Sequence, residues 1–363
     1  MITPVTGPAK DALTEHPIGF GIVGAGMVAQ YHAEAIAQTP GARLVAVCRA
    51  DAARAAETAA RFSVPCETSH AALLARPDVE VVCICTPSGL HAEQTLAAAQ
   101  AGKHVLVEKP MALTLADADA MISACHQSNV LLGVALQRRT DPAFFAAKSA
   151  IAAGALGRLV LGSVTVPYLR TQDYYDSAAW RGTWKLDGGG ALMNQGIHLL
   201  DLLLWYLGDV AEVQAQMTTL AHKIEVEDCI SATLRFTSGA LGSIAATTAA
   251  APGYPHRVEV YGQRGGMQIE GEQIVRWESE SMPHVPGMTI SKSGITASGA
   301  GSSPHGISQE GHRRLIADMV AAIREKRQPL VPGEEGRRSL ALALAIYEAA
   351  RTGRRVVLEK PAW

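Results

Sequence analysis

The sequence predicts two α/β domains: a Rossmann domain over residues 18–137 and a C-terminal α+β domain over residues 138–363 with a mostly antiparallel sheet. A chain of 363 residues, 48% of them hydrophobic, exceeds the usual size of one hydrophobic core. Up to about residue 137, apolar strand-like runs alternate with helical stretches, which predicts a parallel sheet. Later strand-like runs follow one another across turn signals, which predicts an antiparallel sheet with one face free.

The composition favours a small-molecule partner. The formal net charge of -2 gives no electrostatic reason to bind nucleic acid or a membrane surface, and no run approaches the ~18 apolar residues of a membrane span. The six cysteines include no CxxC pair, and Cys48, Cys83 and Cys85 lie in apolar runs typical of buried free thiols. We expect a cytoplasmic protein without a bound metal. Residues 1–17 lack the apolar core of a signal peptide and are interpreted as a disordered leader.

The first predicted strand, residues 18–23 (IGFGIV), runs directly into GAGMVA and a helical stretch through residue 38. This GxGxxA pattern at a strand-to-helix turn predicts a dinucleotide site, because the helix N-terminus attracts the pyrophosphate. The first glycine permits the tight turn, the second lets the backbone approach the phosphates, and Ala29 allows close helix packing. The predicted cofactor contacts here are Gly24, Gly26, Met27 and Val28.

Arg49 follows the second strand, residues 43–48, at the position where an acidic residue normally binds the adenosine ribose. A guanidinium there can pair with a 2'-phosphate, whereas an aspartate would repel it. The sequence therefore favours NADP. The alternative is a solvated Arg49 beside NAD, with Asp51 close enough to take part.

The strand-like runs 79–85 and 103–107 end in the loops TPSGLH and EKP. Ligands of an open parallel sheet bind at the carboxyl ends of its strands, so these loops should border the cofactor. The residues expected there are Thr86, Pro87, His91, Glu108 and Lys109. A lysine in a solvent-exposed loop is the alternative for Lys109. Helix 115–127 and strand 130–135 then close this domain.

Residues 188–208 (GGGALMNQGIHLLDLLLWYLG) predict a buried helix, since apolar residues surround it almost completely. Asn194, His198 and Asp201 lie at i, i+4 and i+7 and share one face, which must meet polar partners or a ligand. His198 is a candidate general base, with Lys109 as the cation that stabilises alkoxide charge. The alternative is a core histidine whose hydrogen bonds are satisfied by Asp201.

Residues 168–184 (YLRTQDYYDSAAWRGTW) are rich in aromatic and guanidinium groups. Trp180 and Trp184 could stack on a sugar, or they could pack the domain interface. Guanidinium groups suit a carboxylate or phosphate. The arginines expected near the interdomain cleft are Arg138, Arg139, Arg170 and Arg181, so we expect an anionic substrate.

The second domain is expected to begin with helix 143–153 and strand 158–167. The further strands are expected at 212–217, 229–236, 240–247, 257–261 and 266–269, followed by helices 311–325 and 336–352. Residues 282–309 show little periodicity, and we interpret them as a mobile lid.

Taken together, the GxGxxA turn, TPSGLHAEQTLAAAQAGKHVLVEKP, the helix 188–208 and the tail IYEAARTGRRVVL resemble the Gfo/Idh/MocA family over residues 18–358. The resemblance implies hydride transfer between NAD(P) and a secondary alcohol of a sugar, inositol or related compound. It also implies a large open C-terminal sheet that forms homodimers or homotetramers. By the family's motifs, Lys109 is the active-site lysine, Lys109–Pro110 is a cis peptide, Glu108 touches the cofactor and His198 is the acid/base.

One departure from the family pattern concerns Asn194, where many members have an aspartate. Asparagine cannot take up a proton, so proton transfer would fall on His198, with Asn194 orienting the reactants by hydrogen bonding. MNQGIH and YYDSAAWRGTW are similar to the branch that oxidises C3 of UDP-N-acetylglucosaminuronic acid. Three alternatives stay open: NAD-assisted glycoside cleavage, a dihydrodiol-type dehydrogenase and a nonenzymatic NAD(P)-binding regulator.

Overall fold

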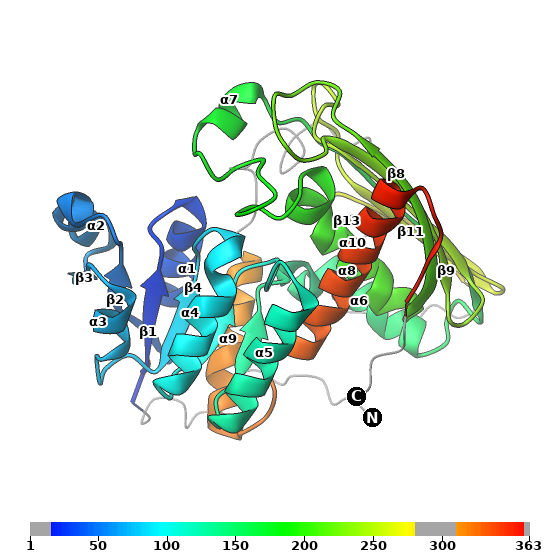
Figure 1. Cartoon of the computed structure of the whole chain (residues 1–363). Coiled ribbons are helices and arrows are strands. Elements are labelled where there is room, and N and C mark those ends of the chain that lie inside the picture. Colours follow the sequence, from blue (N-terminus) through cyan, green and yellow to red (C-terminus); the bar gives the residue numbers. More distant parts are fainter. Residues whose placement is uncertain (1–15, 280–309, 359–363) are drawn as a thin grey trace.

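The computed structural model describes residues 16–279 and 310–358. The predicted lid 282–309 and nearly all of the predicted leader lie outside the described residues. The described chain forms two sheets with their helices, and the first sheet lies beside helices that separate it from the second (Figure 1).

The first sheet has six parallel strands in the order β3-β2-β1-β4-β5-β6. This is the strand order of a Rossmann domain, whose ligands bind where the order reverses, between β1 and β4. The strands are β1 (Ile18–Val23), β2 (Ala42–Cys48), β3 (Cys66–Glu67), β4 (Val81–Ile84), β5 (His104–Val107) and β6 (Leu132–Val134). The helices are α1 (Met27–Ala37), α2 (Ala55–Phe62), α3 (His70–Leu74), α4 (His91–Gln100) and α5 (Leu115–Gln127), with 3-10 turns η1 (Ala52–Arg54), η2 (Ser88–Leu90) and η3 (Gln137–Thr140).

The second sheet has eight strands in the order β13-β12-β11-β7-β10-β9-β8-β14, antiparallel except for the β7–β10 pair. The mostly antiparallel prediction is therefore confirmed. The strands are β7 (Leu159–Pro167), β8 (Val210–Thr218), β9 (Cys229–Phe236), β10 (Leu241–Thr247), β11 (Arg257–Gly262), β12 (Gly265–Glu270), β13 (Gln273–Ser279) and β14 (Val356–Val357). The helices are α6 (Pro142–Ala152), α7 (Gln172–Asp176), the π-helical turn η4 (Ala191–Gly196), α8 (Ile197–Leu207), α9 (Glu310–Glu325) and α10 (Gly333–Thr352).

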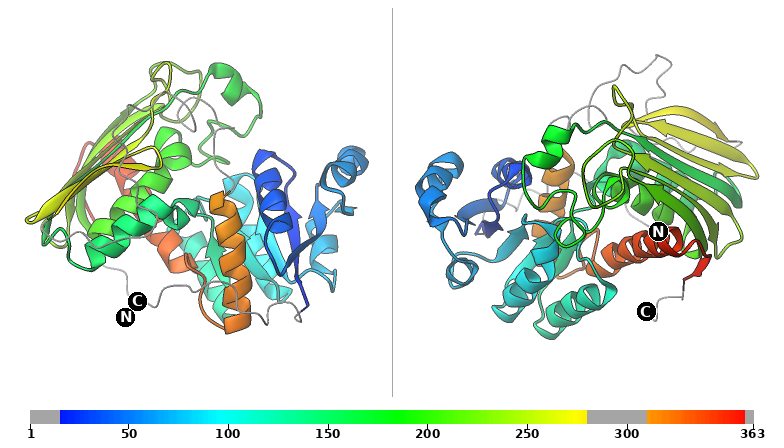
Figure 2. Two further views of the ribbon diagram at one scale, coloured as in Figure 1. Left: turned by 180° about the vertical axis from the view of Figure 1, so that it is seen from behind. Right: turned by 45° about the horizontal axis from the view of Figure 1, so that its top comes forward.

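One face of this sheet is covered by α6, α8 and α10 (Figure 2). Burial alternates along β9 and β10, because successive side chains point to opposite faces of a sheet. The outward side chains include the exposed Leu161 and Leu241, which are paired in register across β7 and β10.

Helix α9 departs from the predicted domain boundary. The sequence predicts that residues 310–325 belong to the second domain, but Ile316, Met319 and Val320 share a buried cluster with Phe20 and Ile36 of the Rossmann domain. The chain returns to the first domain because α9 has an apolar stripe that covers α1 (Figure 1). This return also brings His312 to the site described next.

Candidate active site

A cavity of about 420 Å³ lies at the carboxyl edge of the first sheet, between the two domains. Its walls come from the glycine turn after β1, the loops after β4 and β5, η3, the segment around α7, and η4 with the start of α8. The predicted site residues on these walls are Gly24, Gly26, Met27, Val28, Thr86, Pro87, Glu108, Lys109, Arg138, Arg170, Trp180, Arg181, Asn194 and His198.

The glycine turn fits an anionic dinucleotide. Gly24 has φ +99°, and a Cβ there would lie 2.6 Å from the carbonyl oxygen of Cys85, so only glycine allows this close approach. A Cβ at Gly26 would meet nothing within 4 Å, which leaves open space directly before the N-terminus of α1. Backbone N–H groups at a helix N-terminus attract phosphate, so this cradle could hold the pyrophosphate of NAD(P).

His91 and Arg49, two predicted cofactor contacts, do not line the cavity. The His91 side chain is buried behind the wall, with Nδ1 2.8 Å from the oxygen of Pro110 and Nε2 2.9 Å from that of Thr86. It therefore ties together the two loops that form the wall. Arg49 is half-buried at the end of β2, where its backbone N–H donates to Glu67. Asp51 caps η1 by accepting from Ala53 at 3.2 Å.

The turn η4 is held by two buried side chains from other elements. Glu227 accepts hydrogen bonds from the N–H groups of Gly190 and Leu192, both at 2.9 Å, and from the hydroxyl of Tyr347 at 2.9 Å. A Cβ at Gly190 would lie only 1.7 Å from the Glu227 carbonyl oxygen, so the glycine run lets the backbones approach closely. These contacts fix the start of the segment that carries Asn194 and His198.

Lys109, Asn194 and His198 converge on the cavity. The Lys109 ammonium donates to the Asn194 backbone oxygen at 2.9 Å and lies 3.5 Å from Asn194 Oδ1. Burial lowers the pKa of His198 well below its usual value, and the cations Lys109 and Arg138 lower it further. The imidazole is therefore neutral at neutral pH and able to accept a proton. The Lys109–Pro110 peptide is cis, as predicted.

Asp187 also lines the cavity, although the sequence analysis did not identify it. Its carboxylate is buried and accepts from Asn194 Nδ2 at 2.7 Å and from the N–H of Gly182 at 2.9 Å. Burial raises the pKa of Asp187, opposed by these hydrogen bonds and by Lys109 and Arg181. The one sequence feature that could have indicated Asp187 is its position directly before the glycines at 188–190.

Glu108 joins two histidines from distant parts of the chain. His32 Nε2 of α1 lies 2.9 Å from Glu108 Oε1, and His312 Nε2 of α9 lies 3.5 Å from the same oxygen. Burial raises the pKa of Glu108, but the hydrogen bonds from His312 and His32 outweigh it and hold the pKa well below its usual value. The two histidine nitrogens and the Glu108 oxygen lie within 4.8 Å of one another. An ionised Glu108 thus lies beside Lys109.

The predicted arginines surround the far part of the cavity. Arg138 pairs with Glu272, and Arg170 lies 5.5 Å from the ring centre of Tyr168. Arg181 lies 4.6 Å from the ring centre of Trp180, so a cation already occupies one face of that ring. Trp184 lies outside the lining, where its ring packs edge-on against Tyr347 at 5.3 Å. Its other partners, Arg351 and the backbone oxygen of Glu225, also belong to the second domain, so Trp184 packs within that domain.

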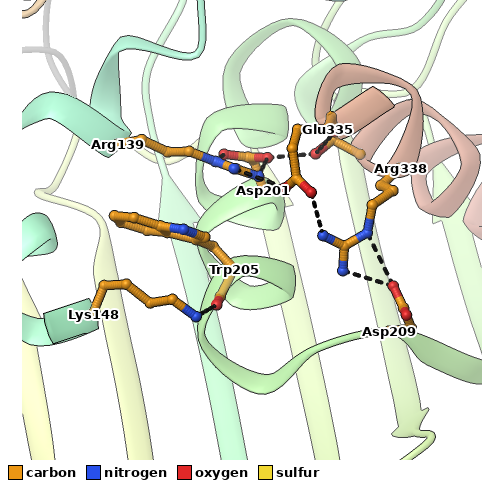
Figure 3. Close-up of polar contacts among 8 residues, drawn as sticks. Arg139, Lys148, Asp201, Trp205, Asp209, Glu335 and Arg338 are labelled. Atoms are coloured by element: carbon orange, nitrogen blue, oxygen red, sulfur yellow. Dashed lines mark hydrogen bonds and ion pairs between the residues drawn. The ribbon is translucent and has the colours of Figure 1, made fainter. Parts of the chain in front are cut away.

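Asp201, expected on the substrate side with Asn194 and His198, does not line the cavity. It is fully buried and accepts two hydrogen bonds from Arg139, both at 2.7 Å, and one from Ser339 at 2.5 Å (Figure 3). The predicted polar stripe is divided, because η3 and α10 cover α8 one turn beyond His198. Asp201 pairs with Arg139, so it does not satisfy the hydrogen bonds of His198 as a purely structural role for this histidine would require.

Comparison with protein families matches both halves of the chain. The oxidoreductase family with an NAD-binding Rossmann fold (GFO/IDH/MocA) matches residues 18–136, and the GFO/IDH/MocA C-terminal domain matches residues 144–268.

Individual relatives match nearly the whole chain. A 1,5-anhydro-D-fructose reductase of Ensifer adhaerens is 31% identical, over 94% of this chain and 98% of its own length. An inositol 2-dehydrogenase of Rhizobium meliloti is 29% identical, over 93% and 98%. The crystal structure of the WlbA dehydrogenase from Bordetella pertussis, in complex with NADH and UDP-GlcNAcA, superposes with a TM-score of 0.84 at 35% identity, over 95% of this chain and 100% of that chain.

Proposed function

The chain belongs to the Gfo/Idh/MocA family of NAD(P)-dependent oxidoreductases, and we propose that it transfers a hydride between the nicotinamide and a secondary alcohol of an anionic sugar derivative. The observation that carries the proposal is the convergence of Lys109, Asn194 and His198 on one cavity beside the glycine turn. The cofactor supplies the hydride acceptor. The residues supply the proton transfer and the charge stabilisation.

His198 is proposed as the general base for alcohol oxidation. An alcohol is too weak an acid to lose its proton unaided at neutral pH, so hydride departure requires a base that removes this proton. Burial and nearby cations keep His198 neutral, so a ring nitrogen can accept this proton, although the same lowering of its pKa makes the imidazole a weaker base. In the reverse direction, the imidazolium returns the proton to the alkoxide.

Lys109 is proposed to stabilise the negative charge that develops on the substrate oxygen. Its ammonium is anchored on Asn194 rather than free to rotate, so it costs little reorganisation during the reaction. The asparagine holds the lysine in place and takes up no proton. Glu108 and Asp187 supply the negative charges that balance it.

The substrate is proposed to carry a carboxylate or phosphate, with a UDP-linked uronic acid as the first candidate. Arg138, Arg170 and Arg181 line the same cavity as Lys109, and guanidinium groups bind such anions with two parallel hydrogen bonds. The WlbA dehydrogenase, crystallised with UDP-GlcNAcA, provides independent support at 35% identity. Arg181 comes from YYDSAAWRGTW, the segment whose sequence resembles that branch.

For the cofactor we infer a preference for NADP, because Arg49 occupies the position that would face a 2'-phosphate. The NADH bound in the WlbA complex favours the opposite preference for that protein. Asp51, the carboxylate that could favour NAD here, is engaged in capping η1.

The free face of the second sheet is proposed to form a homodimer or homotetramer, since Leu161 and Leu241 are exposed side by side there. No helix among the described residues is long and apolar enough to cross a membrane. The six free cysteines fit the cytoplasmic location that we propose.

A substrate panel tests the function. Nicotinamide absorbance would be followed with UDP-linked uronic acids, free uronic acids, neutral sugars and inositols, with each cofactor in turn. We expect the highest kcat/KM for an anionic sugar. Equal or better kcat/KM for neutral sugars would contradict the anionic substrate, and sugar cleavage without net consumption of cofactor would favour glycoside cleavage.

A further inference from the structure

Many family members have an aspartate where this chain has Asn194, and here the neighbouring carboxylate comes from Asp187 instead. Asp187 is 3% exposed and lines the cavity that holds Lys109 and His198. Each of its oxygens accepts one hydrogen bond, Oδ1 from Asn194 Nδ2 and Oδ2 from the N–H of Gly182. Neither of these donors comes from solvent, so the carboxylate is part of a fixed arrangement.

The contact with Asp187 also decides how the Asn194 amide is oriented. A carboxylate only accepts hydrogen bonds, so it selects the orientation in which Asn194 presents its NH2 group to Asp187. The oxygen Oδ1 of Asn194 is then directed to Lys109, 3.5 Å from Nζ. The opposite amide orientation would place an NH2 group against the ammonium and an oxygen against the carboxylate.

We propose that Asp187 is a positioning residue for Lys109, orienting the Asn194 amide and supplying negative charge that stabilises the ammonium. The proposal rests on the function proposed above, in which that ammonium stabilises the alkoxide. Asp187 thereby compensates for the asparagine at position 194, through a residue seven positions earlier in the chain.

The charges that face Lys109 determine what removing Asp187 would do. Burial lowers the pKa of Lys109, Glu108 and Asp187 oppose this, and Arg181 and Arg170 reinforce it. His198 also lies close but is neutral. Without the Asp187 charge, the pKa of Lys109 falls further, and the ammonium is lost at a lower pH. The alkaline limit of activity should therefore move to lower pH.

Asp187→Asn provides the first test. Its amide offers one acceptor oxygen to two donors, Asn194 Nδ2 and the Gly182 N–H, so one donor is left facing an NH2 group. We expect the alkaline limb of the kcat/KM profile to move down by about one pH unit and kcat/KM at alkaline pH to fall roughly tenfold. Asp173→Asn, on the exposed surface of α7, removes the same charge and should leave the limb unchanged.

The exchange variant Asp187→Asn/Asn194→Asp provides the rescue. The amide at 187 would then accept from Gly182 and donate to the carboxylate at 194, so every hydrogen bond regains a partner and the negative charge returns beside Lys109. We expect the alkaline limb to move back toward its wild-type position. A matched activity loss at all pH values in Asp187→Asn, or a limb that the exchange does not restore, would overturn the proposal.

A measurement without substrate separates this proposal from the proposed function. The pH dependence of reductive methylation of Lys109, followed by mass spectrometry of its peptide, reports the lysine pKa directly. We expect the midpoint to fall in Asp187→Asn and recover in the exchange variant. An unmoved midpoint refutes the role of Asp187 even if the enzyme oxidises sugars, whereas a moved midpoint in a protein inactive on every sugar refutes only the proposed function.

Discussion

Arg138 and Arg139 are consecutive in η3, yet they belong to regions of opposite character. Arg138 lines the cavity with Lys109 and His198. Arg139 points the other way and pairs with Asp201 in a network that includes Glu335 (Figure 3). The two regions meet on α8, where His198 and Asp201 are separated by less than one helical turn.

The two regions differ in whether their polar groups are satisfied. In the network, Arg139 donates to both oxygens of Asp201 and to Glu335 at 2.8 Å, and its guanidinium lies 5.4 Å from the ring centre of Trp205. In the cavity, His198 Nδ1, Arg181 Nε and Gln195 Oε1 are buried without a hydrogen-bond partner in the described part of the chain. A buried unsatisfied group costs about 1–3 kcal/mol, and a ligand in the cavity could offset this cost by hydrogen bonding to these atoms. The two regions therefore differ more in whether their buried polar atoms have hydrogen-bond partners than in the types of residue that they contain.

His198→Ala should give the largest effect, and this effect should be on turnover. We expect kcat to fall by about 10²- to 10⁴-fold with cofactor affinity nearly unchanged, because the imidazole transfers a proton and does not hold the dinucleotide. Steady-state kinetics and cofactor titration measure the two quantities.

The control is His126→Ala, which removes an exposed histidine that pairs with Glu334 and does not line the cavity. Lys109→Ala should also damage turnover, and its effect should not simply add to that of His198→Ala, because both residues act on the same substrate oxygen. Near-normal turnover without His198 would refute its assignment as the base.

Arg139→Met should instead lower the free energy of unfolding. Removing one partner of a buried ion pair leaves Asp201 as an uncompensated buried charge, which typically costs about 3–5 kcal/mol. Urea unfolding of cofactor-free protein, followed by tryptophan fluorescence, measures the loss.

Two further variants test this interpretation. Arg276→Met, which breaks an exposed pair with Glu278, should cost roughly 0–1 kcal/mol. Arg139→Met/Asp201→Asn should cost less than the sum of its parts, since the second change removes the unpaired charge. If Arg139→Met were as stable as Arg276→Met, the buried network would not contribute to the stability of the fold, and the distinction between the two regions would lose its energetic basis.

The Rossmann half of the fold could be predicted because each of its elements has a local signal. Leu115–Gln127 has the predicted bounds, and the glycine turn lies where GxGxxA placed it. Strand β13 was missed because QIVRWES carries charged residues at its exposed positions and becomes a strand only by pairing with β12. In β13, hydrogen bonding to β12 outweighs the low intrinsic preference of these residues for a strand.

The cavity could be predicted only in part, because its remaining residues depend on contacts between distant segments. His312 reaches Glu108 only because α9 returns to the first domain, and Asp187 matters only through Asn194. The π-helical turn η4 gives no apolar pattern of its own, so a single helix was expected over residues 188–208. Asp201 was misplaced because periodicity indicates which side chains share a face but not which element covers it.

Arg49→Asp should give the smallest of these effects and test a third region, the adenosine end of the proposed cofactor site. A 2'-phosphate within ~4 Å of a half-exposed guanidinium gains at most a few kcal/mol before solvent screening, enough for roughly tenfold preference for NADP. The aspartate removes this attraction and adds repulsion, so the preference should invert.

Arg43→Asp, at the opposite end of β2 and about 20 Å away, changes the net charge equally and should leave the ratio of the NAD and NADP dissociation constants unchanged. If Arg49 served only to stack on adenine, its replacement would weaken both cofactors alike. Dissociation constants of NAD and NADP at two salt concentrations decide between these roles. The pyrophosphate is common to both cofactors, so a salt-dependent NADP to NAD ratio reports the pairing of Arg49 with the 2'-phosphate. An unchanged ratio in Arg49→Asp refutes that pairing.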